Sequence, residues 1–156
     1  WGWVKKGAPI VIEVGGRDMA AGNVSVIRRD RLYREDGKLD SVATPRDGFA
    51  GAVPALLAEI QQALFAEAKA RLEANITPAA DWSAVEAHFA EGRATPGWLE
   101  VQWARPTGAA LDKVVERLKA LKLTLRNAPA GQAAADGACI FTGEAAVERV
   151  LVGRAY

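Results

Sequence analysis

The sequence predicts an α+β or α/β fold in three consecutive parts: a β-rich, truncated α/β half-domain, a long connecting helix and a two-layer α+β domain. Three observations support this fold class. The first part contains runs of β-branched residues between glycines, the second has apolar residues at a helical spacing, and the third alternates between helical and strand patterns. We therefore expect the three parts to span residues 1–46, 47–78 and 79–156. A chain of 156 residues, half of them hydrophobic, can bury such cores.

The first part contains three predicted strands and no predicted helix. The first strand ends at a turn formed by Gly15 and Gly16, and Asp36-Gly37 marks a second tight turn. A sheet needs a layer over its apolar face, and 46 residues provide none, so this part is expected to belong to a larger domain. The strands are expected at residues 9–14, 23–29 and 39–44.

A long helix is predicted next, because apolar residues recur at spacings of three and four. Pro54 is expected in its first turn, where a proline needs no N–H group, and residues 75–78 end it. No run approaches eighteen apolar residues, so we expect no membrane-spanning helix. The apolar stripe comprises Val53, Leu56, Leu57, Ile60, Leu64, Ala68 and Leu72.

The last part is predicted to place two helices on one face of a mostly antiparallel sheet. Asp81 is a candidate N-cap for a short helix that ends at Gly92, and Thr107-Gly108 opens a second amphipathic helix. The strands are expected at residues 97–104, 123–125, 139–142 and 147–152.

The composition excludes several functional classes. The one cysteine, Cys139, cannot form an internal disulfide. Together with the one histidine, His88, it provides too few Cys and His ligands for a typical zinc site. A Ser-His-Asp or Cys-His catalytic unit would have to use His88. We therefore expect neither a metalloenzyme nor a hydrolase, but a soluble protein of a reducing compartment. No helix with a Gly-Lys-Ser/Thr pattern follows Gly15-Gly16, so these glycines are interpreted as a turn and not as a phosphate loop.

Charge and aromatic residues point to a polyanion at one end of the chain. The net charge is +1, but residues 1–46 carry nine Lys/Arg against six Asp/Glu. Cations bind phosphates and aromatic rings stack on unpaired bases, so this mixture suits single-stranded RNA; an ordinary sheet edge is the alternative. The residues concerned are Lys5, Lys6, Arg17, Arg28, Arg29, Arg31 and Arg34, among Trp1, Trp3 and Tyr33.

Residues 1–18 resemble a segment of the prolyl-tRNA synthetases with the pattern W-E-x-K-G-x-P-x-R-x-E-x-G-x-[KR]-D. The similarity continues in order along nearly the whole chain. Residues 24–30 are similar to the following strand, 56–65 to the long helix of that family, and 97–103 with 138–143 to its carboxy-terminal domain. The final Ala155-Tyr156 resembles the family's ending. The form resembled is the archaeal/eukaryotic-type enzyme of class II.

The resemblance implies an enzyme that activates proline with ATP and transfers it to tRNA. Residues 1–46 would be the second half of the anticodon-binding domain, and 79–156 the zinc-binding-like terminal domain. The class II catalytic motifs lie upstream in that family, so we expect no catalytic residue and no cofactor in this chain; ATP and magnesium would act in the absent catalytic domain. The expected setting is a cytoplasmic homodimer that binds tRNA, without DNA or a membrane as partner.

Two departures from the family pattern matter. The four zinc-binding cysteines of the family fall at Ala104, Ala109, Cys139 and Thr142, so we expect no metal and instead apolar packing by Trp103, Val101 and Ile140. The Glu and Arg that contact anticodon bases in the family fall at Val4 and Val11, which cannot hydrogen-bond a base.

Lys6, Arg17 and Asp18 match the family pattern and are the tRNA contacts that the resemblance implies. Two alternatives remain open. One is a synthetase-like RNA-binding or regulatory paralogue without aminoacylation activity, which Val4 and Val11 motivate. The other is a purely structural module that stabilises a dimer.

Overall fold

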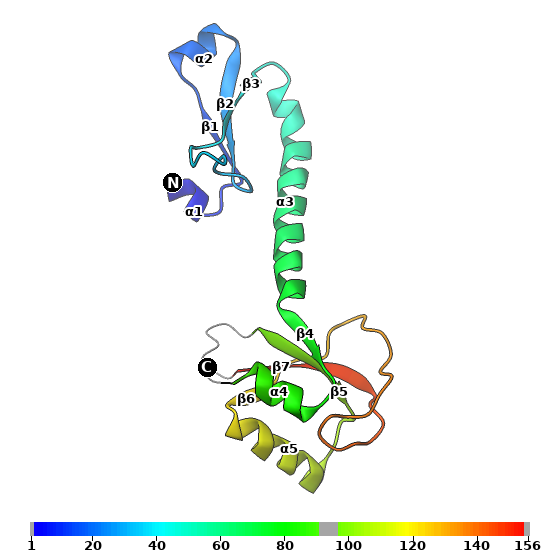
Figure 1. The fold of residues 1–156 in the computed structure, drawn as a ribbon. Helices are drawn as coiled ribbons and strands as arrows, with labels where there is room; N and C mark the ends of the chain where they lie inside the picture. Colours follow the sequence, from blue (N-terminus) through cyan, green and yellow to red (C-terminus); the bar gives the residue numbers. More distant parts are fainter. Residues whose placement is uncertain (1, 91–96, 155–156) are drawn as a thin grey trace. The chain divides into compact units, whose positions relative to one another are not determined.

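The computed structural model describes residues 2–90 and 97–154, and within these it shows helices and mixed sheets. This confirms the α+β fold class. The chain forms two compact units, Trp1–Ala70 and Arg71–Tyr156, which are described separately below (Figure 1). The predictions that involve Trp1, Gly92 and residues 155–156 lie outside the described residues. The three-part division of the sequence stays a prediction.

Unit 1 contains a three-stranded antiparallel sheet in the order β1-β2-β3. The three predicted strands are confirmed, and the third begins two residues later than expected and includes Pro45, which an edge strand tolerates. Two short helices flank β1. The elements are α1 (Gly2–Lys5), β1 (Ile10–Glu13), α2 (Gly16–Ala20), β2 (Asn23–Arg28) and β3 (Ser41–Pro45).

The prediction that residues 1–46 contain no helix is wrong, because a helix of four or five residues is too short to show an apolar period. Gly15, expected in a plain turn, is the N-cap of α2. Its backbone N–H donates to Asp18 Oδ2 (3.1 Å), which is half of a capping box. Local capping therefore sets this helix.

The predicted long helix is α3 (Phe49–Ala74), with 26 residues. Pro54 lies in its second turn and not in its first, because the helix already begins at Phe49, directly after Gly48 with φ +79°. Ile60, 1% exposed, is the buried residue of its inner stripe. Asn75 follows the end of α3, and its side-chain amide donates to the Arg71 carbonyl (2.7 Å), one of the carbonyls that the last turn leaves without a partner.

α3 bears on the expectation that the chain has no membrane-spanning helix. An 18-residue window of this helix has a mean hydropathy of 1.3, so among the described residues α3 is long and apolar enough to span a membrane. Its alanines raise the mean although charged residues interrupt the apolar run. One helix of this kind is weak evidence, so length and composition alone do not indicate a membrane protein.

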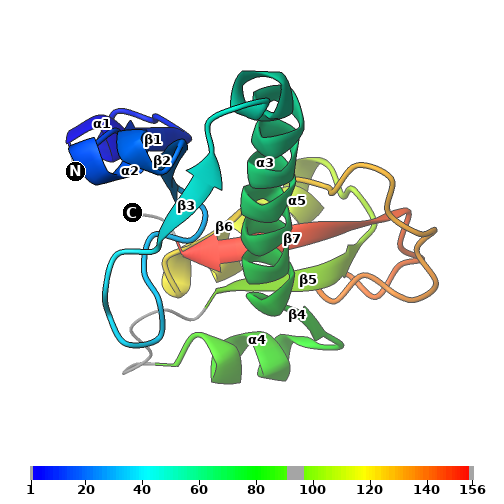
Figure 2. The ribbon, with the colours of Figure 1, turned by 90° about the horizontal axis from the view of Figure 1, so that it is seen from above.

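Unit 2 contains a four-stranded mixed sheet in the order β4-β5-β7-β6, with α4 and α5 packed on one face (Figures 1 and 2). β4 pairs parallel with β5, and the other two pairings are antiparallel. Val85, Leu99, Val101 and Val152 lie at the centre of the core. The elements are β4 (Ile76–Ala79), α4 (Trp82–His88), β5 (Trp98–Trp103), α5 (Gly108–Ala120), β6 (Leu123–Leu125) and β7 (Glu148–Arg154).

Two predictions for unit 2 are wrong. Strand β4 was not expected, because it is short, contains Pro78 and follows a helix stop signal; an edge position accommodates the proline. Residues 139–142 form a turn and not a strand. The Gly143 N–H donates to the Cys139 carbonyl (2.9 Å) and the Cys139 N–H to the Glu144 carbonyl (2.7 Å), so the backbone closes on itself here. The remaining helices and strands of this unit are confirmed within a few residues.

Candidate nucleic-acid interface

The sheet of unit 1 has two faces with different surroundings. Side chains alternate along each strand, and directly opposed residues of antiparallel strands share a face. Val26 is opposed to Val42, and Val24 to Thr44, on the face that α3 covers, which we call the Val26 face. Val11 is opposed to Ile27, and Glu13 to Ser25, on the other face, which we call the Val11 face.

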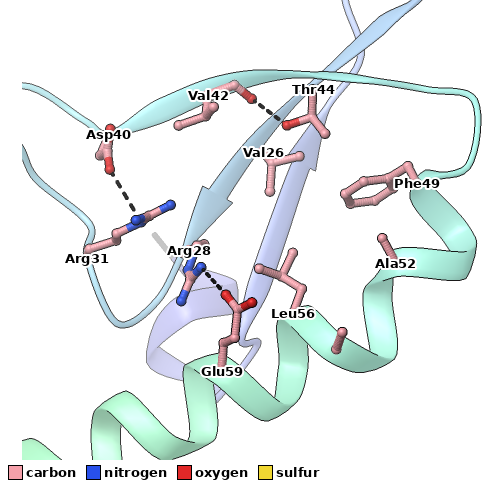
Figure 3. A pocket seen from close by; sticks show the side chains of 11 residues that line it. Val26, Arg28, Arg31, Asp40, Val42, Thr44, Phe49, Ala52, Leu56 and Glu59 are labelled. Atoms are coloured by element: carbon pink, nitrogen blue, oxygen red, sulfur yellow. Dashed lines mark hydrogen bonds and ion pairs between the residues drawn. The ribbon is translucent and has the colours of Figure 1, made fainter.

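The Val26 face carries a hollow of about 300 Å³ between β2, β3 and α3 (Figure 3). Ion pairs close one side of it. Arg28 contacts Asp30 (2.9 Å) and Glu59 (3.1 Å), and Arg31 contacts Asp40 (3.7 Å). The hydrogen bond from Arg28 is the main cause that holds the pKa of Asp30 below its ordinary value, and the same bond raises the pKa of Arg28. Arg28 and Arg31 therefore form ion pairs with acidic side chains of the same chain. These ion pairs account for two arginines of the predicted basic cluster without RNA.

The Val11 face carries a smaller hollow of about 220 Å³. The structure brings Val4 and Val11 together here, although they are seven positions apart in the sequence and separated by a turn at Gly7 (φ +103°). These are the two positions that the family resemblance assigns to base contacts. The full lining is Val4, Val11, Glu13, Ile27, Leu32 and Leu39.

Lys6 and Arg17 lie at opposite ends of β1, since α1 precedes this strand and α2 follows it (Figure 1). Four residues of a strand span about 13 Å, so the structure does not bring these two cations together. Lys6 Nζ lies 4.9 Å from the centroid of the Trp3 ring, which is 68% exposed. Arg17 is exposed on α2. The two side chains can therefore contact separate points of one extended ligand that crosses β1.

Asp18 already has partners within the protein. Its Oδ2 accepts from the Gly15 N–H (3.1 Å) and its Oδ1 accepts from the Ser25 hydroxyl (3.2 Å). These bonds cap α2 and hold it against β2. These hydrogen bonds give the Asp18 carboxylate a structural role that requires no RNA. The tRNA contact at Asp18 stays a prediction.

In unit 2, the four positions that the resemblance assigns to zinc offer one thiol, one hydroxyl and two methyl groups, which do not fit zinc. Cys139 is buried, with 2% exposure. Burial raises the pKa of the Cys139 thiol, but hydrogen bonds from the Thr142 hydroxyl and from backbone N–H groups of Ala104, Phe141 and Thr142 outweigh it, so that pKa lies below its usual value. Among the described residues, no group of three or more His, Cys, Asp and Glu side chains could hold a metal.

Aromatic packing occupies this part of unit 2. The Phe141 ring lies between those of Trp82 (5.7 Å) and Trp103 (5.6 Å), and the Arg117 guanidinium covers the Trp82 ring at 4.3 Å. Val101 and Trp103 belong to the core, with Ile140 packed against it, as the sequence suggested. Phe141 was missed, because its position in a turn between two tryptophans depends on tertiary structure.

No protein-family model matches the chain. Over its whole length it is 62% identical to a proline--tRNA ligase of Sphingomonas elodea, 61% to one of Sphingopyxis alaskensis and 52% to one of Novosphingobium aromaticivorans. It spans 31%, 29% and 30% of the length of these relatives. Because these matches cover the whole chain at this overall identity, the sequence belongs to the proline--tRNA ligase family and corresponds to about 30% of the length of these relatives.

Proposed function

We propose that the polypeptide containing this chain attaches proline to tRNA with the use of ATP, and that this chain supplies RNA binding and structural support without catalysis. The observation that carries the proposal is the identity of 52–62% along the whole chain to three proteins named proline--tRNA ligase. The proposed partner is tRNA, and the proposed setting is a cytoplasmic homodimer without DNA or a membrane.

The geometry of unit 1 supports an RNA contact. Lys6 and Arg17 offer cations at the two ends of β1, and the Trp3 ring beside Lys6 is exposed enough to stack on a base. The hollow of the Val11 face, which Val4 and Val11 line, also lies along β1. An extended strand of RNA can thus place phosphates at the ends and a base in the middle.

Catalysis is assigned to residues outside this chain. Adenylation of an amino acid requires ATP and magnesium close to the substrate carboxylate, and we place both in the part of the polypeptide that these 156 residues do not include. The role of this chain is then to hold and orient the RNA.

The test is proline-dependent ATP–pyrophosphate exchange and charging of tRNA by the full-length polypeptide. We expect both reactions from the full-length polypeptide, and neither from residues 1–156 alone. A full-length polypeptide that binds tRNA but catalyses neither reaction would overturn the proposal.

Val4 and Val11 favour one second candidate, an RNA-binding paralogue without aminoacylation activity. In this hollow, valines stand at the two positions where the family has Glu and Arg. Such a replacement is expected in a protein that no longer forms the family's hydrogen bonds to a base. The exchange assay separates the two candidates, because the paralogue would bind RNA without exchanging pyrophosphate.

A further inference from the structure

One face of α3 within unit 1 is an uncharged, mostly apolar stripe. Its side chains recur at spacings of three and four positions, so they lie on one side of the helix. The stripe runs over three turns, about 16 Å at 1.5 Å per residue. The charged Glu67 and Lys69 lie outside it. We call it the Phe65 stripe, and it consists of Leu57, Gln61, Leu64, Phe65 and Ala68.

The described residues leave this stripe open. The Phe65 side chain is 62% exposed and that of Leu57 is 37% exposed. The sheet of unit 1 lies against a different side of α3, from which Phe49, Leu56 and Glu59 turn toward the strands (Figure 3). The stripe is therefore a second apolar surface of α3, separate from the hollow of the Val26 face.

A helix with such a surface needs a partner. Most of the stability of a helix in a protein comes from the packing of its apolar face, and among the described residues Ile60 is the one buried residue of α3. Contiguous exposed apolar side chains on a soluble protein usually mark an interface. A lipid bilayer around this helix would bury the charges of Glu67 and Lys69, so a protein surface fits the stripe better.

The rest of the polypeptide is the best-placed partner. The chain spans 29–31% of the length of its relatives, so more than two thirds of their length has no counterpart in these 156 residues. A segment of the same polypeptide is present at an effective concentration on the order of millimolar, which a second copy in dilute solution does not reach. The spacing of positions 57, 61, 64 and 68 is that of a seam between two helices.

We propose that the Phe65 stripe is the docking surface for an amphipathic helix from the remaining part of the same polypeptide. Phe65 provides the largest apolar contact, and Leu57 and Leu64 pack on either side of the same seam. Gln61 is the polar residue of the stripe, and it fixes the register by a hydrogen bond to a polar side chain of the docked helix. This interface goes beyond the proposed function, because it requires neither RNA nor catalysis.

The first test places the photoreactive side chain p-benzoyl-phenylalanine at position 65 of the full-length polypeptide. It resembles Phe65 in shape and links on irradiation to C–H groups that touch it. We expect a cross-link within one polypeptide, to a segment outside residues 1–156 that mass spectrometry identifies. The matched control carries the same side chain in place of Ala66, which is exposed on the opposite side of the helix and should give little of this product.

A cross-link between two copies, seen as a band of dimer mass, would assign the stripe to a second copy and overturn the proposal. A cross-link confined to residues 1–156, or no cross-link from position 65, would overturn it as well.

The second test measures amide hydrogen exchange of residues 61–68 in the full-length protein. Phe65→Asp places a charge in the seam and should speed this exchange about tenfold or more, the effect of losing the burial of one large apolar side chain. Ala66→Asp adds the same charge on the opposite side and should stay below about threefold, the cost of an aspartate in a helix interior. Equal effects of the two substitutions would show that Phe65 faces solvent, and would overturn this interface while the proposed function stands.

Discussion

The Phe141 ring meets the Trp103 ring almost perpendicularly, at 87° with centroids 5.6 Å apart. This edge-to-face contact joins the 139–142 turn to β5, where the family resemblance would place a metal. Such pairs add about 0.5–1.5 kcal/mol beyond the burial of their area. Packing of this kind can hold the turn without a metal ion.

We predict that the protein contains no structural zinc. Only Cys139 offers a thiolate at the four positions concerned, and zinc requires about four donors. Elemental analysis of full-length protein purified without chelators should find less than stoichiometric zinc, and added EDTA should leave the melting temperature unchanged. One zinc per chain, or a chelator-dependent loss of stability, would contradict this prediction.

Phe141→Ala should destabilise unit 2. Fully buried phenylalanines cost about 3–5 kcal/mol when truncated to alanine, and the half-buried Phe141 should cost about 2 kcal/mol or more. Amide hydrogen exchange of β5 and β7 in the full-length protein measures this locally. Val147→Ala removes an apolar side chain that is 60% exposed and should change these amides by less than about 0.5 kcal/mol. Equal effects of the two substitutions would contradict the role given to Phe141.

The Arg28–Asp30 pair predicts how unit 1 responds to acid. The hydrogen bond from Arg28 lowers the pKa of Asp30 in the folded protein from its ordinary value of 3.8. The stability that the pair contributes is therefore present above about pH 3.8 and is lost as the pH falls through the lowered pKa of the folded state.

Asp30→Asn should accordingly lower the stability of β2 at pH 7 by about 1–2 kcal/mol and make its decline in acid shallower. Hydrogen exchange of the β2 amides between pH 3 and pH 7 checks both effects. Asp36→Asn is the control. It removes an exposed ion pair with Lys38 and should change neither the stability of β2 at pH 7 nor its decline in acid. An unchanged acid profile in Asp30→Asn would show that other groups cause the acid response.

Lys6→Ala and Arg17→Ala in the full-length polypeptide should raise the KM for tRNA and leave proline activation almost unchanged. Each lost phosphate contact should also reduce the salt dependence of binding by about one unit of slope. Lys113→Ala and Lys119→Ala, on α5 of unit 2, are charge-matched controls. If all four substitutions weaken binding equally, the attraction is diffuse and the Val11 face is not the specific site.

Elements in which a pattern of apolar residues repeats several times could be predicted from the sequence alone. α3, α5 and β5 were predicted because several apolar residues establish a period in each. α1, α2 and β4 were missed because four or five residues contain barely one turn or one alternation. The position of α2 depends instead on the hydrogen bond between Asp18 and its N-cap Gly15, and that of β4 on pairing with β5; neither is visible as a period.

The candidate site was predictable only in part. Val4, Val11 and Lys6 could be selected from the family pattern, but their arrangement required the fold, because the turn at Gly7 brings Val4 back to β1. Glu13 was not selected, although its spacing of two from Val11 already placed both on one face of a strand. The strand register also places Ile27 opposite Val11. These residues are sixteen positions apart, so their pairing cannot be derived from local sequence.

The alternation along β1 also bears on how such a protein can change its specificity over time. Positions 11 and 13 face the hollow, whereas positions 10 and 12 face the opposite side of the sheet. Substitutions at the odd positions would therefore change the surface that the proposed RNA contact meets, while the side chains at the even positions stay unchanged. Insertion of one residue within the strand would exchange the two sets. Divergence of recognition at this surface should accordingly proceed by replacement at alternate positions, with the length of β1 held constant.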